Sequence, residues 1–288
     1  MQYIGREFTK EEIRRRVGHL SQIAGIKSYT MNEGRAQGVH ALDVKTGSGL
    51  GFTVLPDRAL DIAWMEHNGR ALGFIGKGGI VHSSYYQPYG YEWLRSFNGG
   101  VLTTCGLTQV GPPEREGIWD LGLHGRISNI PADEVNHGVE WEGDELILWI
   151  EGKVREAVIF SENLVLHRRI KAYGGRNRII IDDEIVNEGY EDTPLMILYH
   201  MNMGFPVVDE GSELIAPIIH TSPRDEEARK GIEGFNRFEV PTPGYREQVF
   251  FHKLAVDDRG RSCAAIINEA INLGICVYYN QKELPYFT

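Results

Sequence analysis

The sequence predicts an all-β protein, a large antiparallel sandwich that carries one short helix at its N-terminus. Short apolar runs that end near Gly, Asn or Asp recur along most of the 288 residues. The 34 glycines supply the turns that such a protein needs. The chain shows no regular alternation of strands and helices, which a doubly wound sheet would require. We therefore expect residues 1–288 to form a single sandwich domain.

The N-terminal segment carries the signals of the short helix. Thr9 suits the N-cap position, and Glu12 follows at the spacing that closes a capping box. Phe8 and Ile13 stand where a hydrophobic staple packs. We expect this helix to lie on the outside of a larger β structure.

The strand signals begin with LGFTVLPDRALDIAWMEHNG, residues 50–69. Pro56 divides this segment into two strands, and Asn68-Gly69 is a hairpin turn signal. In LVLHRRIKAY, residues 164–173, apolar and more polar residues alternate with the period of a strand. The segment SPRDEEARKGIEGF predicts a helical surface insertion that begins near Ser222.

Composition narrows the class of protein. Hydrophobic residues make up 42% of the chain, which is enough for a substantial core. The net charge of -10 argues against nucleic acid or an anionic membrane surface as partner. The N-terminus lacks the apolar stretch of a signal peptide, and no run is long enough to span a membrane. The three cysteines are far apart, as reduced thiols are, so we expect a cytoplasmic protein.

Two histidines are the main candidates for chemistry. ILYHMNMGFP, residues 197–206, places His200 and Asn202 two apart, on one face of a predicted strand. LGLHGRISNIPA, residues 121–132, places His124 and Arg126 two apart as well. We expect both pairs at strand ends on the rim of one concave sheet. The alternative for each histidine is a structural role with its hydrogen bonds satisfied inside the protein.

Two further residues are candidates for binding. Arg58 in VLPDRALDI offers a planar fork of donors that suits sugar hydroxyls or a carboxylate. A structural ion pair with Asp57 or Asp61 is the alternative for this arginine. Glu247 follows Gly244 at a strand start, where loops form binding sites, and a solvated surface glutamate is its alternative.

Other motifs point away from cofactors. FNGGVLTTCGLTQVGPP, residues 97–113, is rich in glycine but lacks the Lys-Ser/Thr of a P-loop and the spacing of a dinucleotide loop. We expect tight turns there that bring backbone close to a ligand or a neighbouring strand. No local histidine spacing predicts a metal site.

Several of these segments resemble the galactose mutarotase (aldose 1-epimerase) superfamily. EIVNEGYEDTPLMILYHMNMGFP and LHGRISN resemble the segments that carry its two histidines, and PDRALDIAWMEHNG resembles its early arginine-containing hairpin. With FNGGVLTTCGLTQVG and EQVFFH, the similarity extends to a bacterial branch of aldose-1-epimerase-like proteins and covers the chain from about residue 40. The order and spacing of these segments are more specific than any one of them.

The resemblance implies a supersandwich that binds sugar on one concave sheet and interconverts the α and β anomers of an aldose. A carboxylate base removes the C1 hydroxyl proton, and a histidine acid protonates the ring oxygen. His200 matches the general acid, His124 the second histidine near the ring oxygen, and Arg58 the arginine that binds sugar hydroxyls. Asn202, Arg126 and Glu247 are the further candidates for substrate contacts.

The base that the resemblance implies is a glutamate on a strand near the C-terminus, in a context like Gly-x-Glu-Pro. The sequence reaches YYNQKELPYFT before such a strand appears, so we expect the chain to lack its C-terminal strand or strands. Glu247 is a candidate substitute for that base.

The predicted function is thus an isomerase that acts on a small-molecule sugar or sugar acid by acid–base ring opening, without metal or other cofactor. Arg58 and Arg126 allow an anionic substrate. One alternative is a carbohydrate-binding protein without turnover on the same fold. Another is a metal-dependent sugar isomerase in which His124, His200 and a glutamate bind one ion.

Overall fold

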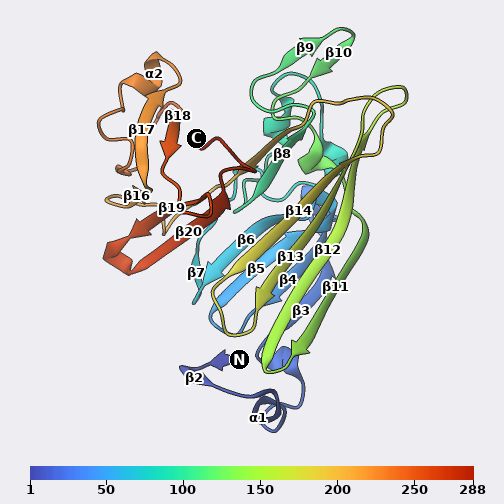
Figure 1. Ribbon diagram of the computed structural model, residues 1–288, viewed down its shortest axis with the longest axis vertical. Helices are drawn as coiled ribbons and strands as arrows, with labels where there is room; N and C mark the ends of the chain where they lie inside the picture. Colours follow the sequence, from blue (N-terminus) through green and yellow to red (C-terminus); the bar gives the residue numbers. More distant parts are fainter. The chain divides into compact units, whose positions relative to one another are not determined.

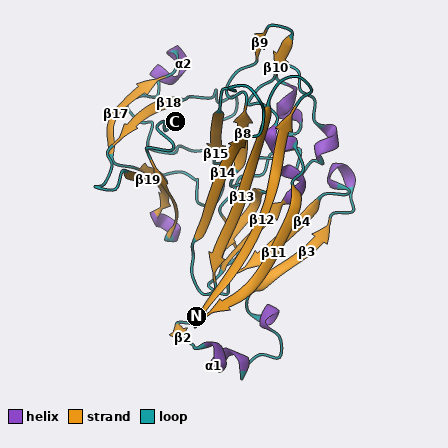
Figure 2. Ribbon diagram, turned by 45° about the vertical axis from the view of Figure 1, so that its right-hand side comes forward, coloured by secondary structure: helices purple, strands orange, loops and turns teal.

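The computed structural model describes residues 1–288, which divide into two compact units, Met1–Asn202 and Met203–Thr288. Antiparallel strands joined by turns and short helices build both units (Figures 1 and 2). The predicted all-β class is confirmed. The single domain expected over residues 1–288 stays a prediction, and each unit is described by itself.

Two antiparallel sheets dominate the first unit. The five-stranded sheet contains, in spatial order, β3 (Gly25–Thr30), β4 (His40–Lys45), β5 (Leu50–Leu55), β6 (Asp61–His67) and β7 (Arg70–Ala71). The four-stranded sheet contains β11 (Asp133–Glu142), β12 (Glu145–Ala157), β13 (Asn163–Tyr173) and β14 (Ile179–Asn187). Three two-stranded ladders accompany them, β8 (Thr103–Leu107) with β15 (Met196–His200), β9 (Glu114–Glu116) with β10 (Trp119–Leu121), and β1 (Gln2–Tyr3) with β2 (Arg6–Glu7).

The core lies between the two larger sheets. On β13 every second residue is buried, as the strand period requires: Leu164, Leu166, Arg168, Ile170 and Ala172. Val165, on the other face, is buried as well. Leu164 and Leu166 pack in one cluster with Ala59, Leu107 and Ile127. The Arg168 guanidinium reaches Asp61 at the start of β6. The predicted alternation is confirmed, with one charged residue in an inward position.

The helices of the first unit are short. Thr9 caps the first of them, and the capping box with Glu12 is formed as predicted. Ile13 is buried on its inner face. The helices are α1 (Lys10–Arg14), η1 (Leu20–Gln22), η2 (Gly34–Ala36), η3 (Pro56–Arg58), η4 (Ser83–Tyr85), η5 (Glu92–Arg95) and η6 (Ile127–Asn129). None of the helices in the structure is long and apolar enough to cross a membrane.

The second unit contains a three-stranded sheet and a two-stranded ladder. The sheet has the order β16 (Glu213–Ile215), β19 (Arg261–Asn268) and β20 (Leu273–Asn280), and the ladder pairs β17 (Ile218–Pro223) with β18 (Phe250–Leu254). The helical insertion expected from Ser222 is mostly wrong, because Ser222 belongs to β17 and only α2 (Glu226–Arg229) is an α-helix. The other helix of this unit is η7 (Glu269–Ile271).

The β8–β15 ladder positions the candidate site. His200 is the last residue of β15 and pairs with Thr103, while Tyr199 pairs with Thr104. A Cβ atom at Gly106 would overlap the backbone oxygen of Met196, so only glycine allows the two strands to approach this closely. The expectation that the glycine-rich segment brings backbone close to a neighbouring strand is confirmed.

Candidate functional site

Four aromatic side chains of the first unit form a closed ring of contacts, which we call the aromatic ring cluster: Trp93, Phe97, His124 and His200. The Trp93 and Phe97 rings stack with centroids 4.6 Å apart. His124 packs on Trp93 at 5.0 Å, and His200 packs on Phe97 at 5.6 Å. The two imidazoles meet edge to face, with centroids 5.6 Å apart. The structure thus brings together the two histidines singled out from the sequence.

His124 lies in a turn, with a left-handed backbone at φ 57°. The expectation that it sits at a strand end is wrong, because the chain turns between β10 and η6 at this point. Its backbone N–H donates to the carbonyl of Gly111, and the Gly111 N–H donates back to the imidazole Nδ1 at 3.2 Å. Because Nδ1 accepts this bond, a neutral His124 ring carries its proton on Nε2.

His200 ends β15 on the face that Leu198 shares. Leu198 packs against the buried residues Trp93, Cys105 and Leu123. His200 therefore projects toward the apolar cluster that also supports His124. Both imidazoles are half-buried.

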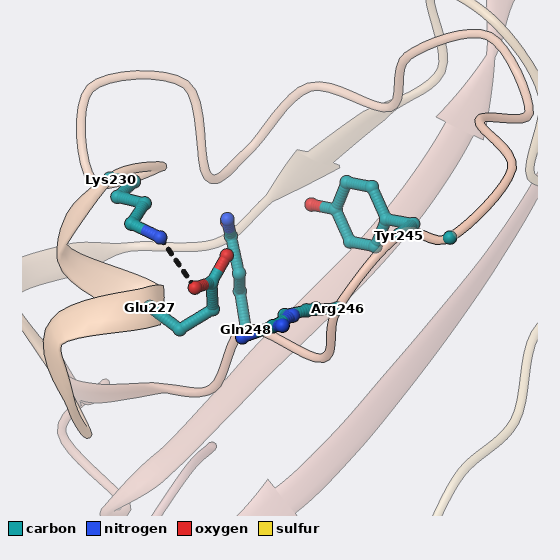
Figure 3. A pocket seen from close by; sticks show the side chains of 6 residues that line it. Glu227, Lys230, Tyr245, Arg246 and Gln248 are labelled. Atoms are coloured by element: carbon teal, nitrogen blue, oxygen red, sulfur yellow. Dashed lines mark hydrogen bonds and ion pairs between the residues drawn. The ribbon is translucent and has the colours of Figure 1, made fainter.

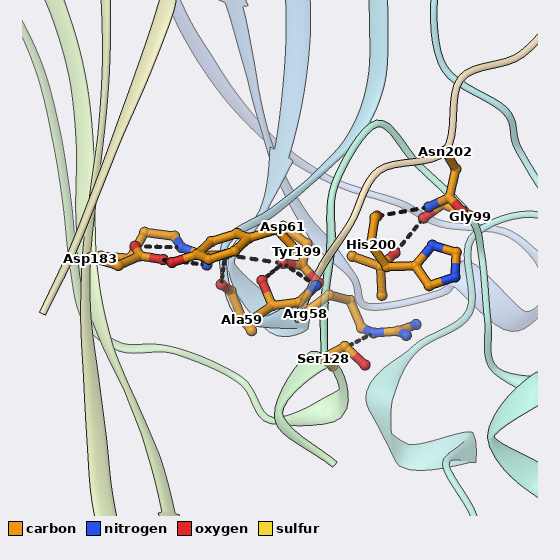
Figure 4. A network of polar contacts seen from close by, with 12 residues as sticks. Arg58, Ala59, Asp61, Gly99, Ser128, Asp183, Tyr199, His200 and Asn202 are labelled. Carbon is orange, nitrogen blue, oxygen red and sulfur yellow. Dashed lines mark hydrogen bonds and ion pairs between the residues drawn. The ribbon is translucent and has the colours of Figure 1, made fainter. Parts of the chain in front are cut away.

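Asn202 lies beyond the end of β15, which is shorter than predicted. Its side-chain amide donates to the carbonyls of Gly100 and His200, at 2.9 and 3.0 Å. Figure 4 shows Asn202 beside His200. Because both bonds join backbone segments, the amide fastens the strand end next to His200. The substrate contact expected of Asn202 stays a prediction.

Arg126 caps η6, and its backbone N–H donates to the carbonyl of Gly106. Its half-buried guanidinium lies near Tyr86 and Glu156. Burial raises the pKa of Tyr86 to about 12, and the charge of Arg126 opposes that shift. Burial also raises the pKa of the Glu156 carboxyl, while hydrogen bonds from Thr108 and Leu107 and the charge of Arg126 lower it. A cation therefore stands two residues from His124, and its binding role stays a prediction.

Arg58 is only 2% exposed. Its three guanidinium nitrogens donate to the backbone carbonyls of Ser128, Val81 and Ser96, at 2.6, 2.6 and 3.0 Å. Neither Asp57 nor Asp61 forms the ion pair considered as its structural alternative. The sugar contact expected of Arg58 stays a prediction, and these contacts favour a role inside the protein.

A buried ionic network supports the strand that carries His200 (Figure 4). Arg168 donates two bonds to Asp183, at 2.9 and 2.7 Å, and one to Asp61 at 3.0 Å. Asp61 also accepts the N–H and hydroxyl of Thr104, and Asp183 accepts the Tyr199 hydroxyl at 2.7 Å. The network connects β6, β13 and β14 with both strands of the β8–β15 ladder.

Glu247 belongs to the second unit. Its side chain is 75% exposed and pairs with Arg224 at 3.0 Å. A cavity of about 450 Å³ lies in the same unit, lined by Glu227, Lys230, Gly244, Tyr245, Arg246 and Gln248 (Figure 3). Lys230 already pairs with Glu227 at 2.6 Å, so its ammonium group is not available to a ligand in the cavity. The substrate role expected of Glu247 stays a prediction.

Sequence reasoning missed four residues that shape the site. Trp93 and Phe97 carry no motif, although their spacing of four in YEWLRSF fits one face of a helical turn. Arg168 had a usable signal, because it falls in phase with the buried residues of β13. Glu156 likewise falls in phase on β12. No group of three or more His, Cys, Asp or Glu side chains is arranged to hold a metal ion.

Comparison with known proteins bears out the resemblance. A family model described as "Domain of unknown function (DUF4432)" matches residues 36–288. The structure of a candidate aldose 1-epimerase from Klebsiella pneumoniae is 25% identical and superposes with a TM-score of 0.85, over 91% of this chain and 68% of that one. No curated protein matches this chain.

More distant structures show the same fold. A galactose 1-epimerase from Lactobacillus acidophilus is 13% identical, with a TM-score of 0.52 over 84% of this chain and 80% of that one. A galactose mutarotase-like protein from Clostridium acetobutylicum is 11% identical, with a TM-score of 0.55 over 86% and 82%. The predicted fold class, a galactose mutarotase-like sandwich, is confirmed.

Proposed function

Because the chain belongs to the DUF4432 family and pairs His124 with His200 on a mutarotase-like fold, we propose that it is a sugar isomerase. It would interconvert the α and β anomers of an aldose or a sugar acid by ring opening. The observation that carries the proposal is the contact between the two imidazoles. The structural neighbour described as a candidate aldose 1-epimerase supports it, since its sequence is 25% identical to this chain over the matched region.

The two histidines suit two different tasks in this reaction. His200 is the proposed general acid, which protonates the ring oxygen as the C1–O bond opens. His124 offers an Nε2–H donor, because its Nδ1 is occupied by the Gly111 N–H. Such a donor would hold the ring oxygen in line with His200. The reaction also needs a base at the C1 hydroxyl, for which the family resemblance implies a glutamate.

The remaining candidates contribute to binding in this proposal. Arg126 would contact a hydroxyl or a carboxylate of the sugar, since its guanidinium is half-buried and two residues from His124. Asn202 would act from the end of β15, where its amide already fixes the backbone next to His200. Glu247 belongs to the second unit, where it pairs with Arg224, and its substrate contact stays a prediction.

Anomer exchange measured by NMR or polarimetry, over a panel of neutral aldoses and sugar acids, tests the proposal. We expect the wild-type protein to accelerate exchange of at least one sugar, and His200→Asn to lose about 10²–10⁴-fold of that acceleration, as for a general acid. His137→Asn changes an exposed histidine of β11 and should leave the rate unchanged.

Two results would contradict this expectation. Absence of exchange with every sugar would overturn the isomerase proposal. Calorimetric binding of a sugar without exchange would instead select a carbohydrate-binding protein on the same fold, since fold alone does not fix activity.

A further inference from the structure

We propose that Arg58 is a positioning residue that assembles the two-histidine site, and that it does not bind sugar. This inference rests on the proposed function only where it concerns turnover. Its structural part concerns the ligand-free protein. It departs from the role that the family resemblance implies for this arginine.

The guanidinium joins three separate segments of the first unit. Nε donates to the carbonyl of Ser128 in η6, Nη1 to that of Val81, and Nη2 to that of Ser96 at the end of η5. These partners are 70, 23 and 38 residues away in the sequence. Because one side chain makes all three contacts, Arg58 fixes the three segments relative to one another.

Two of these segments carry the walls of the aromatic ring cluster. Ser96 directly precedes Phe97, and its hydroxyl donates to the carbonyl of Trp93 at 3.1 Å. Ser128 accepts the indole Nε1–H of Trp93 on its hydroxyl at 3.3 Å. Arg58 therefore holds, through Ser96 and Ser128, the two rings on which His200 and His124 pack. Figure 4 shows Arg58 directed toward Ser128, in the same region as His200.

Arginine suits this task better than any other side chain. Its planar fork presents donors in three fixed directions, whereas a lysine ammonium is a single point. The Arg58 guanidinium is buried and pairs with no carboxylate, so the three carbonyl dipoles compensate its charge. With each nitrogen already engaged and almost no exposed surface, the group is poorly placed to contact a sugar.

The test uses two variants of the full chain and a matched control. Arg58→Lys keeps the charge but cannot reach three carbonyls. Ser128→Ala leaves the Arg58 contacts and removes the hydroxyl that accepts from the Trp93 indole and from the Asn129 amide. It therefore probes the same linkage if Arg58→Lys fails to fold. Arg155→Lys makes the same chemical change at an exposed position on β12.

Two readouts separate positioning from sugar binding. In ligand-free protein labelled with 15N-histidine, assigned through His124→Asn and His200→Asn, we expect the Nε2–H tautomer of His124 in the wild type and in Arg155→Lys. In Arg58→Lys and Ser128→Ala this signature should become averaged. The kcat for anomer exchange should fall on the order of tenfold to a hundredfold, with little change in KM, as expected for misplaced catalytic groups.

The opposite pattern would overturn the proposal. Folded Arg58→Lys with an unchanged histidine signature and a raised KM would assign Arg58 to sugar binding. An unchanged signature in both variants would contradict positioning whatever the kinetics. If the wild-type protein exchanges no sugar, the proposed function fails, while the ligand-free spectra still decide whether Arg58 positions the histidines.

Discussion

Two arginines of the first unit are buried, and the protein compensates their charges in different ways. Arg168 faces the carboxylates of Asp61 and Asp183. Arg58 faces backbone carbonyls, and burial lowers its pKa to about 10, a shift that the charge of Asp61 opposes. Arg58 remains charged at neutral pH. Loss of Arg168 would therefore leave buried carboxylates without their counterion, whereas loss of Arg58 would leave backbone carbonyls without their donor.

Removal of Arg168 should destabilise the protein severely. Arg168→Met fills a similar volume but leaves two carboxylates buried without their counterion, a change that costs about 3–5 kcal/mol in the free energy of unfolding. Urea denaturation followed by circular dichroism would measure it. Tyr199→Phe removes one hydrogen bond to Asp183 and should cost less, about 1.5–3 kcal/mol. Equal losses in both variants would contradict a network centred on Arg168.

Residue chemistry could be predicted only in part. His124 and His200 could be chosen because each stands two residues from a second polar group near a glycine, and the structure places their rings in contact. The partners of Arg58 could not be predicted, because they are backbone carbonyls far along the chain. Carbonyl groups occur at every residue, so no sequence pattern marks the ones that an arginine will reach.

At the scale of elements, the β8–β15 ladder sets the position of His200. The approach of the two strands depends on Gly106, which has φ 132° and lies against the backbone of Met196. The ladder is also fixed from the core side, where Asp61 binds Thr104 and Asp183 binds Tyr199. The strand that carries the proposed acid is therefore fixed on one side by a backbone contact and on the other by buried charges.

Gly106→Ala should push the two strands apart. The added Cβ overlaps a backbone oxygen that cannot move without the whole strand, so we expect a loss of about 1–3 kcal/mol in the free energy of unfolding. His200 should be displaced with its strand, and anomer exchange should slow. Gly69→Ala is the matched control, because Gly69 also has a positive φ, of 74°, but nothing lies within 4 Å of its Cβ position. If both variants behave alike, the close approach at Gly106 is not the cause.

Elements were predictable where local signals and burial agree. The capping box of Thr9 fixed the start of α1, and Pro56 fixed the break between β5 and β6. The structure of the region after Ser222 could not be predicted in this way, because its charged residues fit a surface helix as well as an irregular loop. There Asp225 caps a helix of only four residues. Local propensity indicates that such a helix can begin, whereas its length depends on packing.

At the scale of the whole molecule, the histidine chemistry that we propose lies within the first unit. The paired histidines, the aromatic ring cluster and the buried ionic network all lie within Met1–Asn202. The second unit has its own aromatic cluster, in which His252 lies among Phe235, Phe250 and Phe287. The two units should therefore differ in how their stability depends on pH.

We expect acid to weaken the second unit through His252. Burial lowers the pKa of this imidazole, and its Nδ1 shares a hydrogen bond of 2.9 Å with the Thr221 hydroxyl. Because the folded state binds the proton less tightly than the unfolded state does, this stability is present above the ordinary histidine pKa of about 6.5 and is lost as pH falls below it. Hydrogen exchange of residues 203–288 between pH 7 and 5, corrected for intrinsic rates, would show the loss. His252→Gln cannot titrate there, so its profile should be flatter, and an equally steep profile would assign the effect to other groups.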